Sequence, residues 1–170
     1  MSSRDYWSTP KWLYKLVHEH WNPTLDVCAT EEKAKCRDFI DESSDALNIA
    51  DWARYSLDSD KMGTVTHKYG WMNPPYSDPF SWLEAASKQD MTIIALVRLD
   101  PSTRWWRDII MKKASLVILL SPRIQFEAPP GIKSSSNNGS NALVVLPPKN
   151  APHMGEPTIR FWDIKPYMPK

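Results

Sequence analysis

Two adjacent prolines between a short apolar stretch and an aromatic residue are the feature that most restricts the fold of this chain. In Trp71-Met72-Asn73-Pro74-Pro75-Tyr76 the prolines directly follow a predicted buried strand. A residue before proline is pushed out of the α region, which disfavours a helix at Asn73 and at Pro74. Proline also lacks a backbone N–H, so the segment cannot pair as a central strand. We therefore predict a stiff turn that presents the Asn73 amide, the Pro74 carbonyl and the Tyr76 ring.

The groups on this turn suit a flat ligand with a polar edge. Carbonyl and amide oxygens accept hydrogen bonds from an exocyclic amine, and an aromatic ring stacks on a nucleobase. A surface turn that happens to contain two prolines is the competing interpretation, because short motifs also match by chance. The rest of the sequence has to decide between the two.

Length and charge limit the organisation of the chain. Its 170 residues fit one domain with a core of its own. We predict a single domain over residues 1–170, with a flexible arm at residues 1–7, a tail at residues 165–170 and no separate target-recognition domain. The net charge of +1 gives no strong electrostatic argument for nucleic acid.

Several classes of protein are not expected. No apolar run reaches the roughly 18 residues that a membrane span needs, and the N-terminus lacks the apolar core of a signal peptide, so we expect no membrane and a cytoplasmic location. Cys28 and Cys36 are the only cysteines. Two cysteines are too few for a disulfide scaffold, and they show no zinc-ligand spacing, so no metal is expected.

Apolar runs and turn residues predict alternating helices and strands. Ser8 or Thr9 caps a first helix that has Pro10 at its first position and ends near Trp21. The apolar run at residues 116–120 indicates burial on both faces, as in a parallel sheet. We predict strands at residues 24–29, 37–41, 69–72, 91–99, 115–120, 142–146 and 158–164, and further helices after residues 77–80 and 102–103.

Several stretches of the chain together resemble one known family. The turn at residues 73–76 resembles the Asp/Asn/Ser-Pro-Pro-Tyr catalytic motif of N6-adenine DNA methyltransferases. The ordered set resembles the phage-type Dam family of S-adenosylmethionine-dependent enzymes and covers about residue 7 to about residue 146. The stretches are Thr9-Pro10, Leu25-Asp26-Val27-Cys28-Ala29, Asp45-Ala46-Leu47 with Trp52, Asn73-Pro74-Pro75-Tyr76 and Arg123-Ile124-Gln125-Phe126.

The resemblance implies an α/β fold, that of a single-domain, Rossmann-like class I methyltransferase. Its sheet would be mostly parallel with an antiparallel C-terminal edge, and helices would cover both faces. The strands predicted at residues 142–146 and 158–164 would form the antiparallel end.

The resemblance also implies an activity, the transfer of a methyl group from S-adenosylmethionine to N6 of adenine in DNA. The base would have to leave the duplex to reach the turn. The residues implied for catalysis are Asn73, Pro74, Pro75 and Tyr76. The residues implied for cofactor binding are Thr9, Pro10, Asp26, Cys28, Ala29, Asp45, Ala46 and Asn73.

Asp26 is a candidate on physical grounds as well. A buried, unpaired carboxylate is costly unless something compensates its charge. The carboxyl end of the first strand of an open α/β sheet is where a cofactor binds. We therefore expect Asp26 to hold the amine of S-adenosylmethionine, directly or through water.

Other cofactor residues keep simpler interpretations open. Most methyltransferases carry a glycine-rich loop after the first strand, whereas this chain has Cys28-Ala29-Thr30, as the phage family does. Thr9-Pro10 also fits a helix cap, Cys28 a buried thiol, and Asp45 a loop or N-cap residue. Asp41 and Glu42 are candidates for the ribose hydroxyls or are simply solvated.

DNA contacts are expected in the C-terminal half, where residues 98–133 are rich in Lys and Arg. A long loop at residues 128–141 contacts DNA or is idle and disordered. Target specificity would come from the loops at residues 56–68 and 127–141. The candidates for DNA binding are Arg104, Arg123, Lys133, Ser135 and Asn137.

Two other functions remain open. The same turn would also serve methylation of RNA adenine or of protein glutamine, since both present a planar amine. A non-catalytic module that binds single-stranded nucleic acid through its tryptophans is the third hypothesis, but it leaves Asp26 without a purpose. Target sequence, oligomeric state (monomer or weak dimer) and biological role (restriction-modification protection or regulation) stay open as well.

Overall fold

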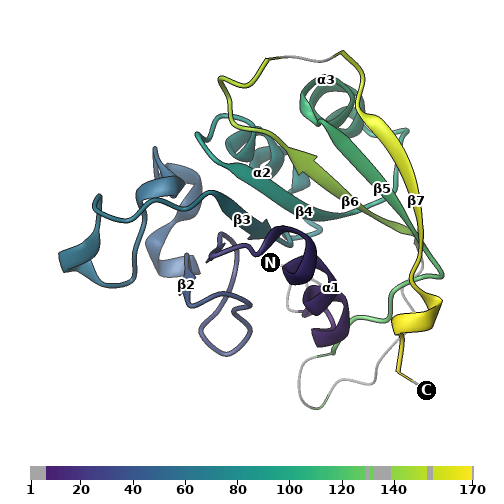
Figure 1. The fold of residues 1–170 in the computed structure, drawn as a ribbon, viewed down its shortest axis with the longest axis horizontal. Coiled ribbons are helices and arrows are strands. Elements are labelled where there is room, and N and C mark those ends of the chain that lie inside the picture. Colours follow the sequence, from purple (N-terminus) through teal and green to yellow (C-terminus); the bar gives the residue numbers. More distant parts are fainter. Residues whose placement is uncertain (1–6, 129–130, 132–138, 153–154, 170) are drawn as a thin grey trace.

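The computed structural model describes residues 7–128, 131, 139–152 and 155–169. In these residues seven strands form one sheet in the order β2-β1-β3-β4-β6-β5-β7 (Figure 1). The strands are β1 (Leu25–Asp26), β2 (Asp38–Phe39), β3 (Tyr69–Met72), β4 (Thr92–Arg98), β5 (Leu116–Ser121), β6 (Asn141–Leu146) and β7 (Thr158–Asp163). Each of the seven predicted strands is therefore present, although β1 and β2 are shorter than predicted.

Helices and single turns connect the strands. The longer helices are α1 (Lys11–Trp21) and α2 (Pro79–Ala86), and the π-helical segment η6 (Trp106–Ile110) runs into α3 (Met111–Lys113). The short turns are η2 (Glu42–Ser44), η3 (Ala46–Asn48), η4 (Trp52–Arg54), η5 (Ser59–Lys61) and η7 (Lys165–Tyr167). As predicted, the segment before α2 caps that helix, because the Asp78 carboxylate accepts a hydrogen bond from the Ser81 N–H at 3.1 Å.

The pairing pattern confirms the predicted fold class and adds detail. The β2, β1, β3 and β4 strands pair in parallel, and β6 pairs antiparallel to both of its neighbours. The antiparallel pairing lies in the C-terminal half of the sheet, as expected, but β6 alone supplies it. The outermost strand, β7, pairs in parallel with β5. The antiparallel strand therefore lies inside the sheet rather than at its edge.

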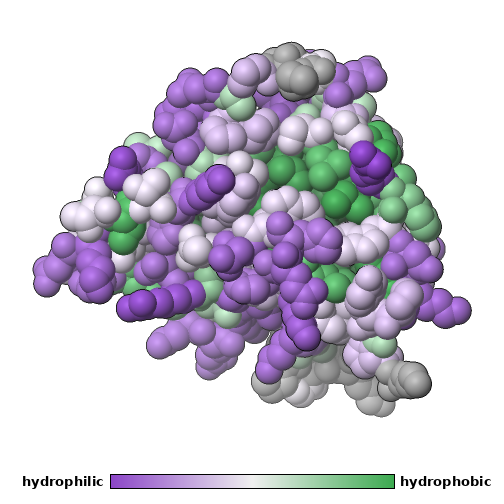
Figure 2. All heavy atoms as spheres, viewed as in Figure 1, coloured by the Kyte–Doolittle hydropathy of each residue, from purple (hydrophilic) through white to green (hydrophobic). Residues whose placement is uncertain are grey.

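Both faces of the sheet are covered, because side chains alternate along each strand. On β4, Ile93, Ala95 and Val97 pack with α2 and η6, whereas Ile94 and Leu96 pack with α1. On the α1 face, Figure 2 shows apolar side chains gathered over β6 and β5 beside α1, with polar side chains around them. Helix α1 therefore covers only part of its face of the sheet.

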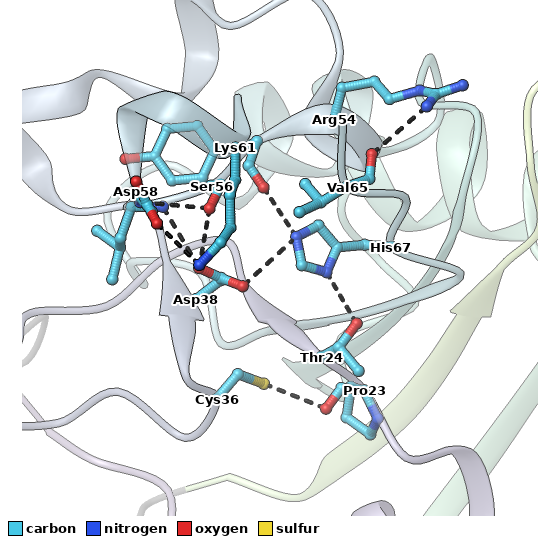
Figure 3. A network of polar contacts seen from close by, with 12 residues as sticks. Pro23, Thr24, Cys36, Asp38, Arg54, Ser56, Asp58, Lys61, Val65 and His67 are labelled. Carbon is cyan, nitrogen blue, oxygen red and sulfur yellow. Dashed lines mark hydrogen bonds and ion pairs between the residues drawn. The ribbon is translucent and has the colours of Figure 1, made fainter. Parts of the chain in front are cut away.

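A polar network lies at the amino ends of the first strands (Figure 3). His67, just before β3, is buried and makes two hydrogen bonds of 2.8 Å, one between Nδ1 and the Thr24 hydroxyl and one between Nε2 and the Tyr55 carbonyl. The Asp38 carboxylate on β2 lies 3.9 Å from the same Nε2. This network ties the end of the polar segment at residues 56–68 to the sheet at the edge opposite the carboxyl ends of β1 and β3.

Candidate active site

A cavity of about 360 Å³ lies at the carboxyl ends of β1, β2 and β3. Its volume is in the range of sites that enclose small molecules, roughly 300–1,000 Å³. Crevices of this kind in open α/β sheets bind ligands. Its lining residues are Trp7, Ser8, Thr9, Asp26, Cys28, Ala29, Thr30, Lys33, Lys35, Ile40, Asp41, Glu42, Asp45, Ala46, Leu47, Trp71, Asn73, Pro75, Ser77, Asp78 and Trp82.

Asp26 lies at the end of β1 and is 2% exposed. Its two carboxylate oxygens accept hydrogen bonds from backbone N–H groups, that of Cys28 at 3.3 Å and that of Lys35 at 3.0 Å. Burial raises the pKa of Asp26 to about 6, although these two hydrogen bonds act in the opposite direction. The carboxylate is therefore held in place by dipoles rather than neutralised by an ion pair within the described residues.

The segment that follows β1 forms a turn and contains no glycine. A turn closed by the Thr30 carbonyl folds the chain back toward β1, which brings the Lys35 N–H to Asp26. The Lys33 and Lys35 side chains line the cavity. Partial burial lowers the pKa of Lys35, an effect that the charges of Glu127 and Asp26 oppose. Sequence reasoning missed both lysines, because their role depends on this turn.

Acidic residues line another part of the cavity. Asp41 caps η2, and hydrogen bonds from the Ser43 hydroxyl and the Ser44 N–H hold its pKa below the usual value. Asp45 has a left-handed backbone with φ 49°, and its carboxylate accepts a hydrogen bond from Asn48 at 2.6 Å. Ala46 is buried beside it. Asp45 is thus both a turn residue and a lining residue, so the two interpretations of it are compatible.

The N-terminal wall is held by a residue far along the chain. Ser8 and Glu127 exchange two backbone hydrogen bonds, of 3.0 and 2.9 Å. The Glu127 carboxylate also accepts from the Lys11 N–H at 3.2 Å, at the start of α1. The predicted cap is corrected here, because α1 begins at Lys11 with Pro10 as its N-cap residue and without a side-chain cap from Ser8 or Thr9. Thr9 lines the cavity and Pro10 does not.

The diproline turn borders the same cavity. Asn73 and Pro75 line it, whereas Pro74 is buried and Tyr76 is half-buried outside the lining. The Tyr76 ring meets Phe126 edge-on, with 6.1 Å between centroids, and its hydroxyl accepts from Asn141 Nδ2 at 3.4 Å. Tyr76 therefore contacts residues outside the cavity lining, beside Phe126 in the last stretch of the family resemblance.

The residues proposed to contact DNA are only partly placed. The Arg104 Nε lies 3.4 Å from Asp108, and its guanidinium lies 5.1 Å from the centroid of the Phe80 ring. Arg123 is exposed after β5. Lys133, Ser135 and Asn137 lie outside the described residues.

The described residues contain neither a metal-binding cluster nor a membrane-spanning helix. Three or more His, Cys, Asp or Glu side chains nowhere gather in a way that could hold a metal ion. None of the described helices has the length and apolar character needed to cross a membrane.

The sheet and the cavity define the chain as a Rossmann-like α/β protein of the methyltransferase type, with an acidic residue after β1 and a polar diproline turn after β3. Comparison with known families then identifies the group. The family described as DNA N-6-adenine-methyltransferase (Dam) matches residues 1–159. The chain belongs to this family, which confirms the predicted resemblance.

Two phage proteins are similar to the chain. A DNA N-6-adenine-methyltransferase of Haemophilus phage HP1 is 31% identical over 155 residues, which cover 87% of this chain and 82% of the phage protein. A DNA N-6-adenine-methyltransferase of Escherichia phage T1 is 27% identical over 118 residues, which cover 67% of this chain and 44% of that protein. The similarity to the HP1 protein thus spans most of both chains.

Proposed function

We propose that this protein transfers a methyl group from S-adenosylmethionine to N6 of adenine in DNA. Family membership makes it an adenine-specific DNA methyltransferase. The observation that supports the finer statement is that Asp26 and Asn73 line one cavity although 46 residues separate them. One of these residues suits a ligand's ammonium group and the other suits an exocyclic amine.

The cavity fits S-adenosylmethionine in size and in the distribution of its chemical groups. Asp26 is a buried carboxylate without an ion pair in the described residues, and it suits the cofactor's ammonium group. Lys33 and Lys35 suit its carboxylate, and Asp41 suits its ribose hydroxyls. When bound, S-adenosylmethionine supplies an electrophilic methyl group. The protein's contribution is then to orient the acceptor and to exclude water.

The diproline turn orients the acceptor. The N6 amine of adenine is a poor nucleophile, because its lone pair is delocalised into the ring. The Asn73 side-chain oxygen and the Pro74 carbonyl accept its two N–H bonds, which favours a pyramidal nitrogen with a localised lone pair. Pro75 fixes this geometry, since a residue before proline has little conformational freedom. Proximity and alignment, rather than a strong base, then account for the rate.

The target base must leave the duplex, because the turn lies beside a cavity that a stacked base cannot enter. Tyr76 stacks on the flipped base in this proposal, which is worth roughly 1–3 kcal/mol. Tyr76 directly follows the turn that holds the acceptor, and its contacts with Phe126 and Asn141 fix the position of the ring.

The decisive experiment is Asn73→Ala. We expect methyl transfer to DNA to fall by at least about 100-fold, because the acceptor loses its alignment. Binding of S-adenosylmethionine, measured by calorimetry, should change little. Asn150→Ala is a matched control, since Asn150 is exposed in the turn after β6. Near-normal turnover by the Asn73→Ala protein would contradict the proposed mechanism.

The choice of substrate needs a separate measurement. Wild-type protein is incubated with labelled S-adenosylmethionine and with DNA, RNA or protein, and the products are analysed by mass spectrometry. N6-methyladenine in DNA is the expected product. A label found mainly in RNA or in glutamine would favour the alternative acceptors, and a complete lack of transfer would favour a binding module.

A further inference from the structure

Cations of the C-terminal half differ in whether a carboxylate accompanies them. Arg104, Arg107 and Lys112 share one carboxylate, that of Asp108, at 3.4, 3.4 and 3.2 Å. These charges are therefore at least partly neutralised within the protein. Arg98 is outside this cluster, and no hydrogen bond or ion pair joins its side chain to another described residue.

Pairing between β4 and β6 places Arg98 at the active-site edge of the sheet. Arg98 is the last residue of β4 and pairs with Asn141, the first residue of β6. Its side chain is exposed and lies against Gly139, where a Cβ atom would be 3.0 Å from the Arg98 Nε. Gly139 therefore allows the guanidinium to lie on the backbone that leads into β6.

The same Asn141 connects Arg98 to the diproline turn. Asn141 is buried, and its Nδ2 donates to the Tyr76 hydroxyl at 3.4 Å and to the Val97 carbonyl at 3.3 Å. Burial raises the pKa of Tyr76, whereas the Asn141 hydrogen bond and the positive charge of Arg98 act in the opposite direction. Arg98 thus supplies positive charge beside the ring proposed to stack on the flipped base.

We propose that Arg98 binds a DNA backbone phosphate next to the flipped adenine. The inference rests on the proposed function, because it needs DNA at this edge of the sheet. A phosphate is covalently attached to the nucleotide that enters the site, so a nearby exposed cation is well placed to contact it. A guanidinium presents a planar fork of donors that matches phosphate oxygens. Such a contact fixes the register of the duplex without reading its sequence.

Salt dependence of DNA binding tests this role directly. Each phosphate contact releases counterions, so the logarithm of the binding constant falls with the logarithm of salt concentration, by about 0.9 per contact in B-DNA. The probe is a labelled duplex that the wild-type protein methylates, and affinity is measured by fluorescence anisotropy at several salt concentrations. For Arg98→Gln we expect several-fold weaker binding and a slope that is shallower by about 0.9.

Two variants make the comparison specific. Arg160→Gln removes the same charge from β7, which is separated from β4 by β6 and β5, and it should leave the slope unchanged. Arg98→Lys keeps a point charge, so it should retain the slope while it weakens binding. An unchanged slope for Arg98→Gln, or an equal decrease for Arg160→Gln, would overturn the inference.

Failure of this inference can be told apart from failure of the proposed function. Asn73→Ala is measured in the same assays and should bind DNA with the wild-type slope while it fails to methylate. If Asn73→Ala is inactive but Arg98→Gln keeps the full slope, only the phosphate contact is wrong. If Asn73→Ala turns over normally, the proposed mechanism fails whatever Arg98 does.

Discussion

Two aspartates on neighbouring strands, Asp26 on β1 and Asp38 on β2, have contrasting surroundings. Asp38 lies at the amino ends of the strands, 3.9 Å from the His67 ring, 3.3 Å from the Leu57 N–H and 3.5 Å from the Ser56 hydroxyl (Figure 3). Asp26 lies at the carboxyl ends and accepts from the Cys28 and Lys35 backbone alone, among the described residues.

The difference distinguishes a structural network at the amino ends of the strands from the candidate binding site at their carboxyl ends. At the amino ends, side chains and backbone groups from several segments form hydrogen bonds with one another, so few donors or acceptors remain for a ligand. At the carboxyl ends, backbone dipoles orient the Asp26 carboxylate, the charge of Lys35 attracts it, and no ion pair to it is formed among the described residues. The buried charge is unfavourable in the free protein, because burial raises the pKa of Asp26, and a bound cationic group would offset that cost.

The largest expected effect is on the stability of the free protein. The pKa of Asp26 is about 6 in the folded state against 3.8 in the ordinary case, so burial of the ionised form opposes folding. The free energy of unfolding is therefore highest, as far as Asp26 is concerned, below pH 3.8, where the group is protonated in both states. It decreases as pH rises through about 6, because the buried carboxyl must then ionise. At pH 7, Asp26→Asn removes an unfavourable charge worth up to about 3 kcal/mol. Its side-chain NH2 cannot accept from the second backbone N–H, which costs about 1–3 kcal/mol at every pH. The pH dependence of the stability difference, rather than its sign at one pH, therefore reports the charge.

Urea unfolding from pH 4 to pH 8 measures this difference. The stability of Asp26→Asn relative to wild type should increase as pH rises through about 6. Asp38→Asn is the control, because it removes a carboxylate that has polar partners, and it should lower stability at pH 7. A gap that stays constant with pH would mean that the charge of Asp26 is compensated in the free protein.

The next effect is on cofactor affinity. Asp26→Asn should weaken S-adenosylmethionine binding by about 10- to 100-fold, because a hydrogen bond between charged groups contributes about 1.5–3 kcal/mol. Wild-type affinity should also decrease as pH falls below about 6, since the protonated acid no longer attracts the ammonium group. Calorimetry at pH 5 and pH 8 measures the affinity of the variant and the pH dependence of wild-type affinity. Equal losses in the Asp26 and Asp38 variants would remove the distinction between the two aspartates.

His67 tests the other side of the comparison. His67→Ala would leave the Thr24 hydroxyl and the Tyr55 carbonyl without their present partner and would open a cavity, so it should cost on the order of 2 kcal/mol of stability. Thermal unfolding measures this loss. Cofactor affinity of the folded protein should stay at the wild-type value, because the network lies at the opposite edge from the cavity. A loss of affinity without a loss of stability would assign His67 to the site.

Local sequence patterns were sufficient to predict most of the fold. The strands are apolar runs bounded by turn residues, and residues 116–120 had the continuous apolar character of a strand buried on both faces. The position of β6 between β4 and β5 could not be predicted in the same way. That pairing joins residues 93–98 to residues 141–146, and no local pattern encodes the choice of partner.

The site was predictable where it depends on strand ends. Asp26 and Asn73 line one cavity because each ends or follows a parallel strand, and neighbouring parallel strands end at the same edge. The supporting groups were not predictable. The Lys35 N–H reaches Asp26 through a turn, and the Glu127 carboxylate reaches the start of α1 from 116 residues away. Both contacts depend on tertiary structure, which brings together groups whose spacing in the sequence has no periodic meaning.

The smallest expected effect concerns an exposed ion pair beside the polar network around His67. Lys61 and Asp58 form an ion pair of 2.8 Å, which is the shortest salt bridge among the described residues, but both side chains are about half exposed. Exposed pairs contribute little, because water and salt screen the attraction and two flexible side chains lose entropy. Lys61→Ala should therefore leave the melting temperature and the cofactor affinity unchanged. A decrease in melting temperature as large as that of His67→Ala would show that the network stabilises the fold through its exposed charges. It would contradict the view that the network stabilises the fold mainly through the buried hydrogen bonds of His67.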